Sequence, residues 1–281
     1  MPSPADPVAF TLVGIAIRWY AIFILTGIVV AVIVARALAI RRGLDPDFAL
    51  DAAPWLVFAG IIGARLYYVL LRFDYFVAHP AEAFNFRLGG MTIHGALAGG
   101  SLMFLYLCRR RRQPPLAWAD VVMPGVAIAQ AIGRWGNWAN QEAFGTPTNL
   151  PWGVAIDVAH RPQQFIAATH FHPTFLYESL FDLVNGVVLA WLALRIPNNP
   201  RLRSGDVLWC YLVLYGVARF VIERMRTDSL YIGPFPAALW ISAGLVCAGV
   251  VGAIASRALS SRNVAPASSP ELPARPDAAD A

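Results

Sequence analysis

The sequence predicts an all-α integral membrane protein with seven transmembrane helices, a small head on the outer side and a disordered C-terminal tail. Hydrophobic residues make up 58% of the 281 residues and charged residues only 14%, whereas charged residues reach about 25% in soluble domains. Mean hydropathy is +0.55. So few charges could not cover the surface of a soluble fold, and the composition also excludes a disordered, collagen-like or coiled-coil chain.

Seven stretches approach the ~20 mostly apolar residues that a bilayer-spanning helix requires. The first, third and seventh are the strongest. The fourth is short and contains Pro124, Gly125, Gly133 and Gly136, which predicts a broken or irregular helix that is buried in protein or faces a cavity. The seven expected spans are Trp19–Ala35, Ala52–Leu71, Met91–Cys108, Val121–Asn137, Phe175–Leu194, Val207–Ile222 and Ala237–Ser256.

The placement of arginine predicts the orientation of a multi-pass protein. The first, third and fifth loops and the C-terminal flank together carry twelve arginines, whereas the alternate loops carry five. Because basic residues concentrate in cytoplasmic loops, the first group is expected inside the cell. The N-terminus is therefore expected outside and the C-terminus in the cytoplasm.

Two segments lie outside the seven spans. Residues 143–173 are too polar to span a membrane and too long for a tight loop, which predicts a small head at the outer face. Residues 263–281 contain four prolines and six alanines with few large apolar side chains, a composition typical of disorder. We therefore expect a membrane domain over residues 1–262, which includes the head, and a disordered cytoplasmic tail beyond it.

Charged residues within the expected spans need an explanation. An arginine near the centre of a spanning helix costs about 2.5–3.5 kcal/mol, so it requires a partner or a watery cavity. Tyr215, Arg219 and Glu223 follow one another at intervals of four residues and therefore share one face of a helix. This spacing indicates either an ion pair that neutralises itself for insertion or a binding site. Arg65 leaves a similar choice between a buried packing ion pair and a functional residue.

A second polar cluster ends the fourth span. Residues 133–142 include Arg134, Asn137 and Glu142, an expensive set at membrane depth. His94 starts a glycine-rich span and is interpreted either as a hydrogen-bonded interfacial residue or as a catalyst. Buried arginines bind phosphate through bidentate, charge-assisted hydrogen bonds, and phosphate at this depth belongs to a lipid head group. The sequence therefore predicts a phospholipid site.

Four runs of sequence carry a resemblance to a known family: GGMTIHG (89–95), GRWGNWANQEAFG (133–145), HPTFLYE (172–178) and YGVARFVIE (215–223). In this order and at this spacing they resemble prolipoprotein diacylglyceryl transferase. The resemblance implies a bacterial inner-membrane enzyme with seven spans and a periplasmic head. It further implies transfer of the diacylglyceryl group of phosphatidylglycerol to the lipobox cysteine of a preprolipoprotein signal peptide, with release of glycerol phosphate.

The resemblance also implies the site. Its catalytic residues are His94, Arg134, Arg219 and Glu223, and its substrate-binding residues are Tyr20, Gly95, Arg134, Asn137, Glu142 and Tyr215. Arg134 and Arg219 would hold the phosphate, and Glu223 would orient Arg219. His94 is the favoured general base, although an arginine field that lowers the pKa of the substrate thiol could serve instead.

The expected partners are phosphatidylglycerol, preprolipoprotein signal peptides and membrane lipids, with no nucleic acid, metal or soluble cofactor. Two positions depart from the family pattern, since Ala96 stands where glycine is common and Arg18 where histidine is common. The rival interpretation is a membrane protein that binds or transports anionic lipids without chemistry. Transporters usually contain internal repeats, and run 133–145 has no second copy in this chain.

Overall fold

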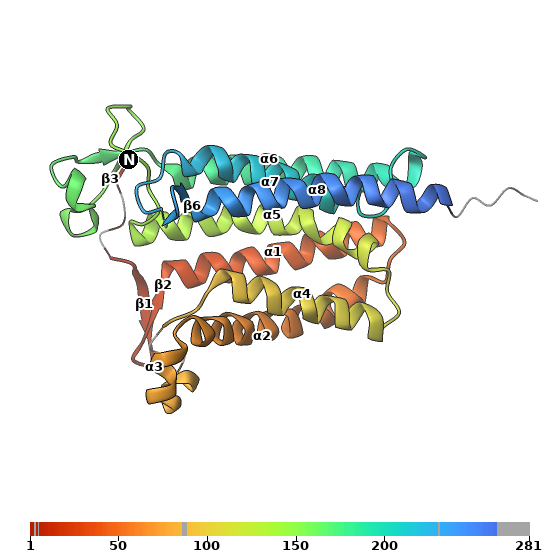
Figure 1. Cartoon of the computed structure of the whole chain (residues 1–281), viewed down its shortest axis with the longest axis horizontal. Helices are drawn as coiled ribbons and strands as arrows, with labels where there is room; N and C mark the ends of the chain where they lie inside the picture. The colour runs from red at the N-terminus through yellow and green to blue at the C-terminus, as the bar shows by residue number, and fades with distance from the viewer. Residues whose placement is uncertain (3, 5, 86–88, 230, 263–281) are drawn as a thin grey trace, which may run out of the picture.

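A computed structural model describes residues 1–262 except 3, 5, 86–88 and 230. The expected disordered tail, residues 263–281, lies outside the described residues. The described chain is a bundle of long helices that run roughly parallel or antiparallel to one another (Figure 1). Helices α5, α6, α7 and α8 form one side of the bundle, α2 and α4 form the other, and α1 lies between them and packs along α5.

The long helices are α1 (Trp19–Arg41), α2 (Pro46–Leu71), α4 (Ile93–Arg110), α5 (Pro115–Asn140), α6 (Thr174–Arg195), α7 (Asp206–Glu223) and α8 (Ala237–Arg262). The short helices are α3 (Phe73–Ala78), η1 (Pro80–Phe84), η3 (Val158–His160), η4 (Gln163–Phe165) and η5 (Ile196–Asn198). The strands are β1 (Val8–Leu12), β2 (Ile15–Arg18), β3 (Val154–Ala155), β4 (His170–Phe171), β5 (Tyr231–Ile232) and β6 (Phe235–Pro236).

Among the described residues, five helices are long and apolar enough to cross a membrane: α1, α2, α5, α6 and α8. Helices α4 and α7 have 18 residues each. Glycines and two terminal arginines lower the hydropathy of α4, and α7 carries Asp206, Arg219 and Glu223. Both helices nevertheless pack along candidate spans, α4 along α2 and α7 along α8. The structure supports a helical membrane protein, and a total of seven spans stays a prediction.

The expected break in the fourth span is wrong, because α5 is a continuous helix with Pro124 inside it. Its glycines serve close packing. A Cβ atom at Gly125 would lie 2.6 Å from the backbone oxygen of Ala31 in α1, and one at Gly186 in α6 would lie 3.1 Å from the backbone oxygen of Pro124. Helices α1 and α6 thus pack closely against α5 next to Pro124. Such packing stabilises a membrane helix in which proline removes one backbone hydrogen-bond donor.

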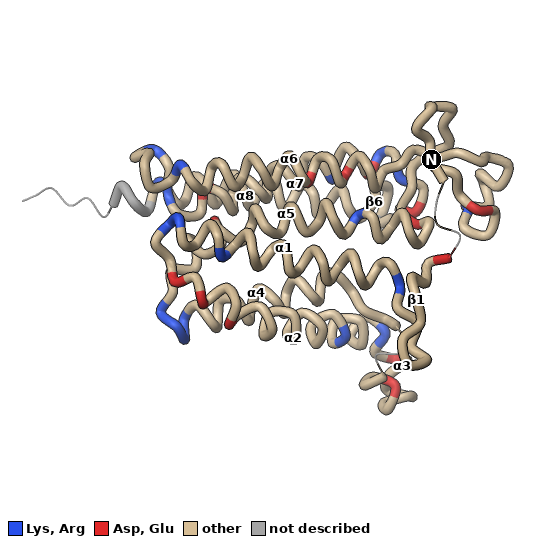
Figure 2. Tube along the Cα trace, turned by 180° about the vertical axis from the view of Figure 1, so that it is seen from behind, with Lys and Arg blue, Asp and Glu red and all other residues tan. Residues whose placement is uncertain are grey.

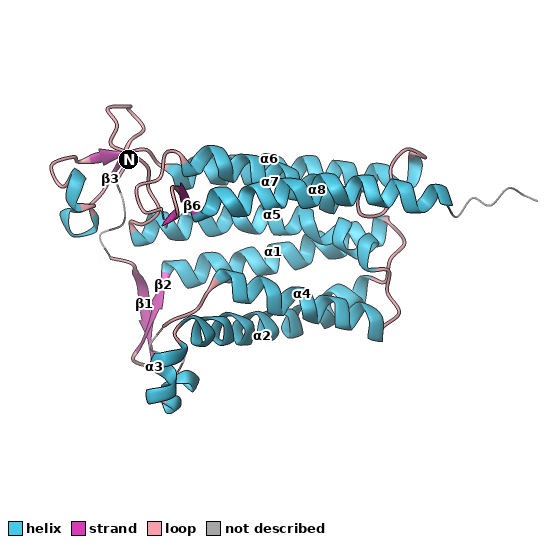
Figure 3. Ribbon diagram, viewed as in Figure 1, coloured by secondary structure: helices cyan, strands magenta, loops and turns pink. Residues whose placement is uncertain are grey.

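The prediction of an all-α fold also needs correction, because three two-stranded antiparallel sheets accompany the helices (Figure 3). Strands β1 and β2 form a hairpin whose turn, Val13 and Gly14, has positive φ at both residues, as a type I′ turn requires. The hairpin leads directly into α1. Strands of two to five residues are too short to show an alternating apolar pattern, so the sequence carried no signal for them.

Residues 143–173 form a small folded unit beyond the ends of α5 and α6 (Figure 1). Strands β3 and β4 pair there, over an apolar cluster that includes Phe144, Val154 and Phe171. An isolated bridge between Gly145 and Arg226 joins this unit to the segment after α7. The unit therefore closes the end of the bundle that α5, α6 and α7 share.

The opposite end of the bundle is fastened by a buried carboxylate. Asp120 on α5 accepts hydrogen bonds from Arg42 Nη1 at 3.2 Å, from the backbone nitrogen of Gly205 at 2.7 Å and from that of Val207 at 3.0 Å. These bonds connect the end of α1 to α5 and to the start of α7. Basic residues concentrate at this end of the molecule (Figure 2).

Candidate functional site

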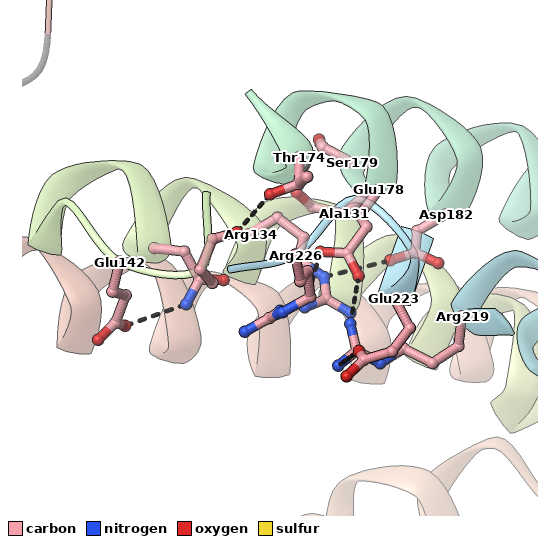
Figure 4. A network of polar contacts seen from close by, with 12 residues as sticks. Ala131, Arg134, Glu142, Thr174, Glu178, Ser179, Asp182, Arg219, Glu223 and Arg226 are labelled. Atoms are coloured by element: carbon pink, nitrogen blue, oxygen red, sulfur yellow. Dashed lines mark hydrogen bonds and ion pairs between the residues drawn. The ribbon is translucent and has the colours of Figure 1, made fainter. Parts of the chain in front are cut away.

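Two arginines that are 85 residues apart in the sequence meet around one carboxylate. Arg134 lies on α5, Arg219 on α7, and Glu178 between them in the second turn of α6. Arg134 Nη1 is 3.1 Å from Glu178 Oε2, and Arg219 Nη1 is 3.1 Å from Glu178 Oε1. Figure 4 shows both guanidinium groups converging on the Glu178 side chain. The three-helix packing of α5, α6 and α7 thus creates the cluster that the sequence analysis expected for the two arginines.

Each arginine has a further carboxylate beside it. Glu223 Oε2 lies 2.7 Å from Arg219 Nη2, and Asp182 Oδ2 lies 3.8 Å from Arg134 Nε. The pair of Arg219 and Glu223 is the ion pair with i,i+4 spacing that the sequence allowed. Since Arg219 also reaches Glu178 on another helix, self-neutralisation within α7 does not explain the whole arrangement. Two guanidinium groups face three carboxylates here.

The arginine pair lines a cavity of about 290 Å³ between α5, α6 and α7. Tyr215 and Tyr177 add hydroxyl groups to its wall, and apolar side chains of α7 such as Val221 complete it. The side chains of Arg134 and Arg219 are 18% and 19% exposed, whereas those of Glu178 and Glu223 are 6% and 2% exposed. The arginines are therefore more exposed than these carboxylates, although Glu178 and Asp182 also line the cavity.

The ion pairs of this cluster are close in distance but imperfectly aligned. Glu178 Oε2, Asp182 Oδ2 and Glu223 Oε2 are buried and accept no hydrogen bond of good geometry from the described residues. Buried polar atoms normally have such partners. These acceptors outnumber the well-placed donors of the site, so an additional anion would have to displace a carboxylate from the arginines.

A polar rim continues from the arginine pair along the last turns of α5. The side-chain amides of Asn137 and Asn140 donate to Glu142 Oε1 at 3.0 and 3.2 Å. The ring of Tyr20, at the start of α1, fills the space that the missing Cβ of Gly136 leaves. Expected site residues from α1 and α5 are thus neighbours.

The structure does not bring His94 to the arginine cavity. His94 lies in the first turn of α4, where Thr92 caps the helix by accepting from the backbone nitrogen of Gly95 at 3.3 Å. Its ring is exposed and lies 6.4 Å from the ring of Tyr67. At Gly95, a Cβ atom would collide with the carbonyl oxygen of Gly63 in α2, so close packing alone requires glycine there. The catalytic and binding assignments of His94 and Gly95 stay predictions.

The side chain of Arg65 contacts backbone carbonyl groups of the segment between α3 and α4. Its guanidinium is buried and donates to the carbonyl oxygens of Ala83, Asn85 and Gly90 at 2.9, 3.1 and 3.0 Å. These carbonyls belong to the segment between α3 and α4, which crosses over α2. Arg65 therefore fastens that segment to the bundle.

Sequence reasoning missed the importance of Glu178 and Asp182. Both lie on α6 at an interval of four residues, the same signal that singled out Tyr215, Arg219 and Glu223. Glu178 was included in a polar run at the outer end of its span but received no function there. Among the described residues, no three His, Cys, Asp or Glu side chains are grouped so that they could hold a metal ion.

The fold and the site define a class of protein: a multi-pass membrane protein with a partly buried arginine pair that lines a cavity. The family model of prolipoprotein diacylglyceryl transferase matches residues 7–255. This chain belongs to that family, and it is a bacterial membrane protein.

Three relatives carry the name phosphatidylglycerol–prolipoprotein diacylglyceryl transferase. The protein of Nostoc sp. is 41% identical over 247 residues, which cover 88% of this chain and 87% of the relative. The protein of Gloeobacter violaceus is 41% identical over 261 residues, with coverage of 92% and 96%. The protein of Finegoldia magna is 38% identical over 246 residues, with coverage of 88% and 94%.

Proposed function

We propose that this protein transfers the diacylglyceryl group of phosphatidylglycerol to the cysteine thiol of a preprolipoprotein lipobox. The observation that carries the proposal is the convergence of Arg134 and Arg219 on one cavity in a member of this transferase family. Two guanidinium groups at membrane depth match the single charged group of a phospholipid that lies at this level, its phosphate.

The proposed orientation follows from charge. We infer that α4 and α7 span the bilayer together with the five candidate spans, so that the chain crosses seven times. The end with Asp120 carries most of the basic residues (Figure 2) and would lie in the cytoplasm. Residues 143–173 and the N-terminus would then lie in the periplasm, above the arginine cavity, and the C-terminus in the cytoplasm of a cell with this enzyme in its inner membrane.

The reaction exchanges one bond for another. The cysteine sulfur attacks the glycerol carbon that bears the phosphate, the carbon–oxygen bond breaks, and a thioether forms. The departing oxygen takes the bonding electrons and leaves as part of glycerol phosphate. Arg134 and Arg219 would hold the phosphate and offset the charge that grows on this oxygen. Glu223 would orient Arg219, while Tyr20, Tyr215, Asn137 and Glu142 would contact the head group.

The thiol proton needs an acceptor. A free cysteine has a pKa of about 8.5, so only a few per cent is ionised at neutral pH. His94 is the proposed general base. Because its ring lies on α4 and not on the cavity wall, the lipobox peptide would have to bind between α4 and the arginine pair for this function. The competing explanation is a thiol whose pKa the two arginines lower directly.

Mass spectrometry of a lipobox peptide tests the proposal. The peptide is incubated with the purified protein and phosphatidylglycerol, and a diacylglyceryl mass gain on cysteine with release of glycerol phosphate supports the transferase. Retention of lipid by the protein without any mass gain on the peptide would instead support the rival, a protein that binds or transports anionic lipids. A peptide with serine in place of the cysteine is the control.

A further inference from the structure

The three carboxylates around the arginine pair are not equivalent. Asp182 pairs with Arg134 at 3.8 Å and Glu223 pairs with Arg219 at 2.7 Å. Glu178 pairs with both arginines at 3.1 Å. If Glu178 withdraws, each arginine therefore still has one carboxylate beside it. The same is true if Asp182 or Glu223 withdraws, so what distinguishes Glu178 is that it alone of the three contacts both arginines.

Glu178 contacts the arginines in the manner of a phosphodiester. Its two oxygens face two different guanidinium groups, Oε2 toward Arg134 and Oε1 toward Arg219. A phosphodiester likewise carries its charge on two non-bridging oxygens, and arginines bind such oxygens through charge-assisted hydrogen bonds. The carboxylate thus occupies the bridging position that a lipid phosphate would take.

The two carboxylate oxygens of Glu178 also differ in their hydrogen bonding. Arg219 Nη1 donates a well-aligned hydrogen bond to Oε1 at 3.1 Å, whereas Oε2 is buried and accepts no aligned hydrogen bond from the described residues. A phosphate entering the cavity would bring a further negative charge to a cluster in which carboxylates already outnumber guanidinium groups. Like charges at this separation and burial repel strongly, so phosphate and carboxylate compete for the same donors.

We propose that Glu178 is an exchangeable occupant of the phosphate site. It bridges Arg134 and Arg219 when no lipid is bound, and it yields one or both guanidinium groups to the lipid phosphate. The inference rests on the proposed function of the arginine pair. Glu178 is in this sense a positioning residue, because it keeps the two arginines at bridging distance while weakening the binding of phosphatidylglycerol.

The decisive variant is Glu178→Gln in the full-length protein, which keeps the size of the side chain and removes the competing charge. Calorimetric titration with short-chain phosphatidylglycerol in detergent is expected to give a Kd about tenfold lower than that of the wild type. The KM for the lipid falls in parallel, and kcat does not rise. A residue that serves structure alone gives the opposite result, so an unchanged or higher Kd overturns the proposal.

Two further measurements keep the test independent of folding and of the proposed activity. Glu178→Asp retains the charge but is too short to bridge both arginines, and its Kd should lie between those of the wild type and Glu178→Gln; a Kd at or above the wild-type value overturns the proposal. Asp51→Asn, an exposed charge change far from the cavity, is the control. A wild type that binds lipid without transferring it refutes the proposed function and leaves the exchange intact.

Titration with inorganic phosphate separates the two sources of the anion. Tighter binding of both inorganic phosphate and phosphatidylglycerol by Glu178→Gln supports exchange at the phosphate group itself. Tighter binding of the lipid alone supports exchange that also requires the acyl chains in the apolar part of the cavity. Tighter binding of neither ligand overturns the proposal.

Discussion

Two carboxylate–arginine clusters among the described residues, one around Asp120 and one around Glu178, differ in how completely their charges are satisfied. At the basic end of the bundle, Asp120 is fully buried, pairs with Arg42 at 3.2 Å and accepts backbone bonds from Gly205 and Val207. In the other half, Glu178 bridges two arginines that remain partly exposed to a cavity, and one of its oxygens has no aligned donor.

This difference distinguishes the Asp120 cluster, whose charges stabilise the fold, from the Glu178 cluster, whose charges can bind a ligand. The Asp120 carboxylate already accepts hydrogen bonds from Arg42 and from the start of α7, which it fixes against α5 and α1. Its oxygens are therefore not available to bind a substrate. The side chains of Arg134 and Arg219 are partly exposed and line a cavity. Both clusters contain a buried carboxylate, but the arginines around Glu178 are more exposed than Arg42. Incomplete hydrogen bonding next to a cavity is the feature that indicates function.

The largest expected effect comes from breaking the unsatisfied cluster. Arg134→Ala removes one of the two groups that hold the phosphate and offset charge on the departing oxygen. We expect transfer to the lipobox peptide to fall about a thousandfold or more, as measured by mass spectrometry. Arg134→Lys keeps the charge but not the planar fork and should recover only part of the rate. Transfer at the wild-type rate in Arg134→Ala would remove the argument for a phosphate clamp.

Breaking the satisfied cluster should damage stability and leave chemistry intact. Asp120→Asn deprives Arg42 of its buried counter-charge and is expected to lower the free energy of unfolding by about 3 kcal/mol. The thermal melting temperature in detergent measures this loss. The rate of transfer per folded molecule should stay near that of the wild type. A stable variant with little activity would contradict the assignment of the Asp120 cluster to stability and of the Glu178 cluster to chemistry.

Sequence patterns identified part of the Glu178 cluster, its two arginines and Glu223, but not Glu178 itself. Intervals of four residues aligned Tyr215, Arg219 and Glu223 on one helix face, and the cost of arginine in a membrane directed attention to Arg134. Periodicity acts within one helix, so it could not predict that Glu178 on α6 would join arginines from α5 and α7. That contact depends on the packing of three helices.

The Asp120 cluster was not predicted, because its carboxylate lies at the boundary of an expected span. Asp120 immediately precedes the expected fourth span, and a carboxylate at a span boundary is usually solvated, so nothing in the sequence distinguished it. The expectation of a broken helix at Pro124 was wrong for a related reason. Local propensity disfavours proline within a helix, but close contacts through Gly125 and Gly186 hold α5 continuous. Tertiary packing decided both outcomes.

A smaller effect on chemistry should come from His94, which lies apart from both clusters. If His94 accepts the thiol proton, His94→Asn lowers kcat about a hundredfold and leaves the affinity for phosphatidylglycerol unchanged. The rate of the variant should then rise with pH through the thiol pKa of about 8.5, because hydroxide and solvent replace the missing base. Stopped assays across pH measure both quantities. A wild-type kcat at neutral pH would assign thiol activation to the arginines instead.

The smallest effect is expected from a third kind of ion pair, one that is exposed to solvent. Arg111 and Asp51 pair at 3.1 Å, but their side chains are 57% and 55% exposed. Water screens such a pair and its side chains lose entropy on ordering, so it contributes little. Asp51→Asn should change neither the melting temperature nor the transfer rate measurably. A clear loss of stability would mean that distance alone, without burial, predicts the worth of an ion pair here, and the contrast between Asp120 and Glu178 would need another explanation.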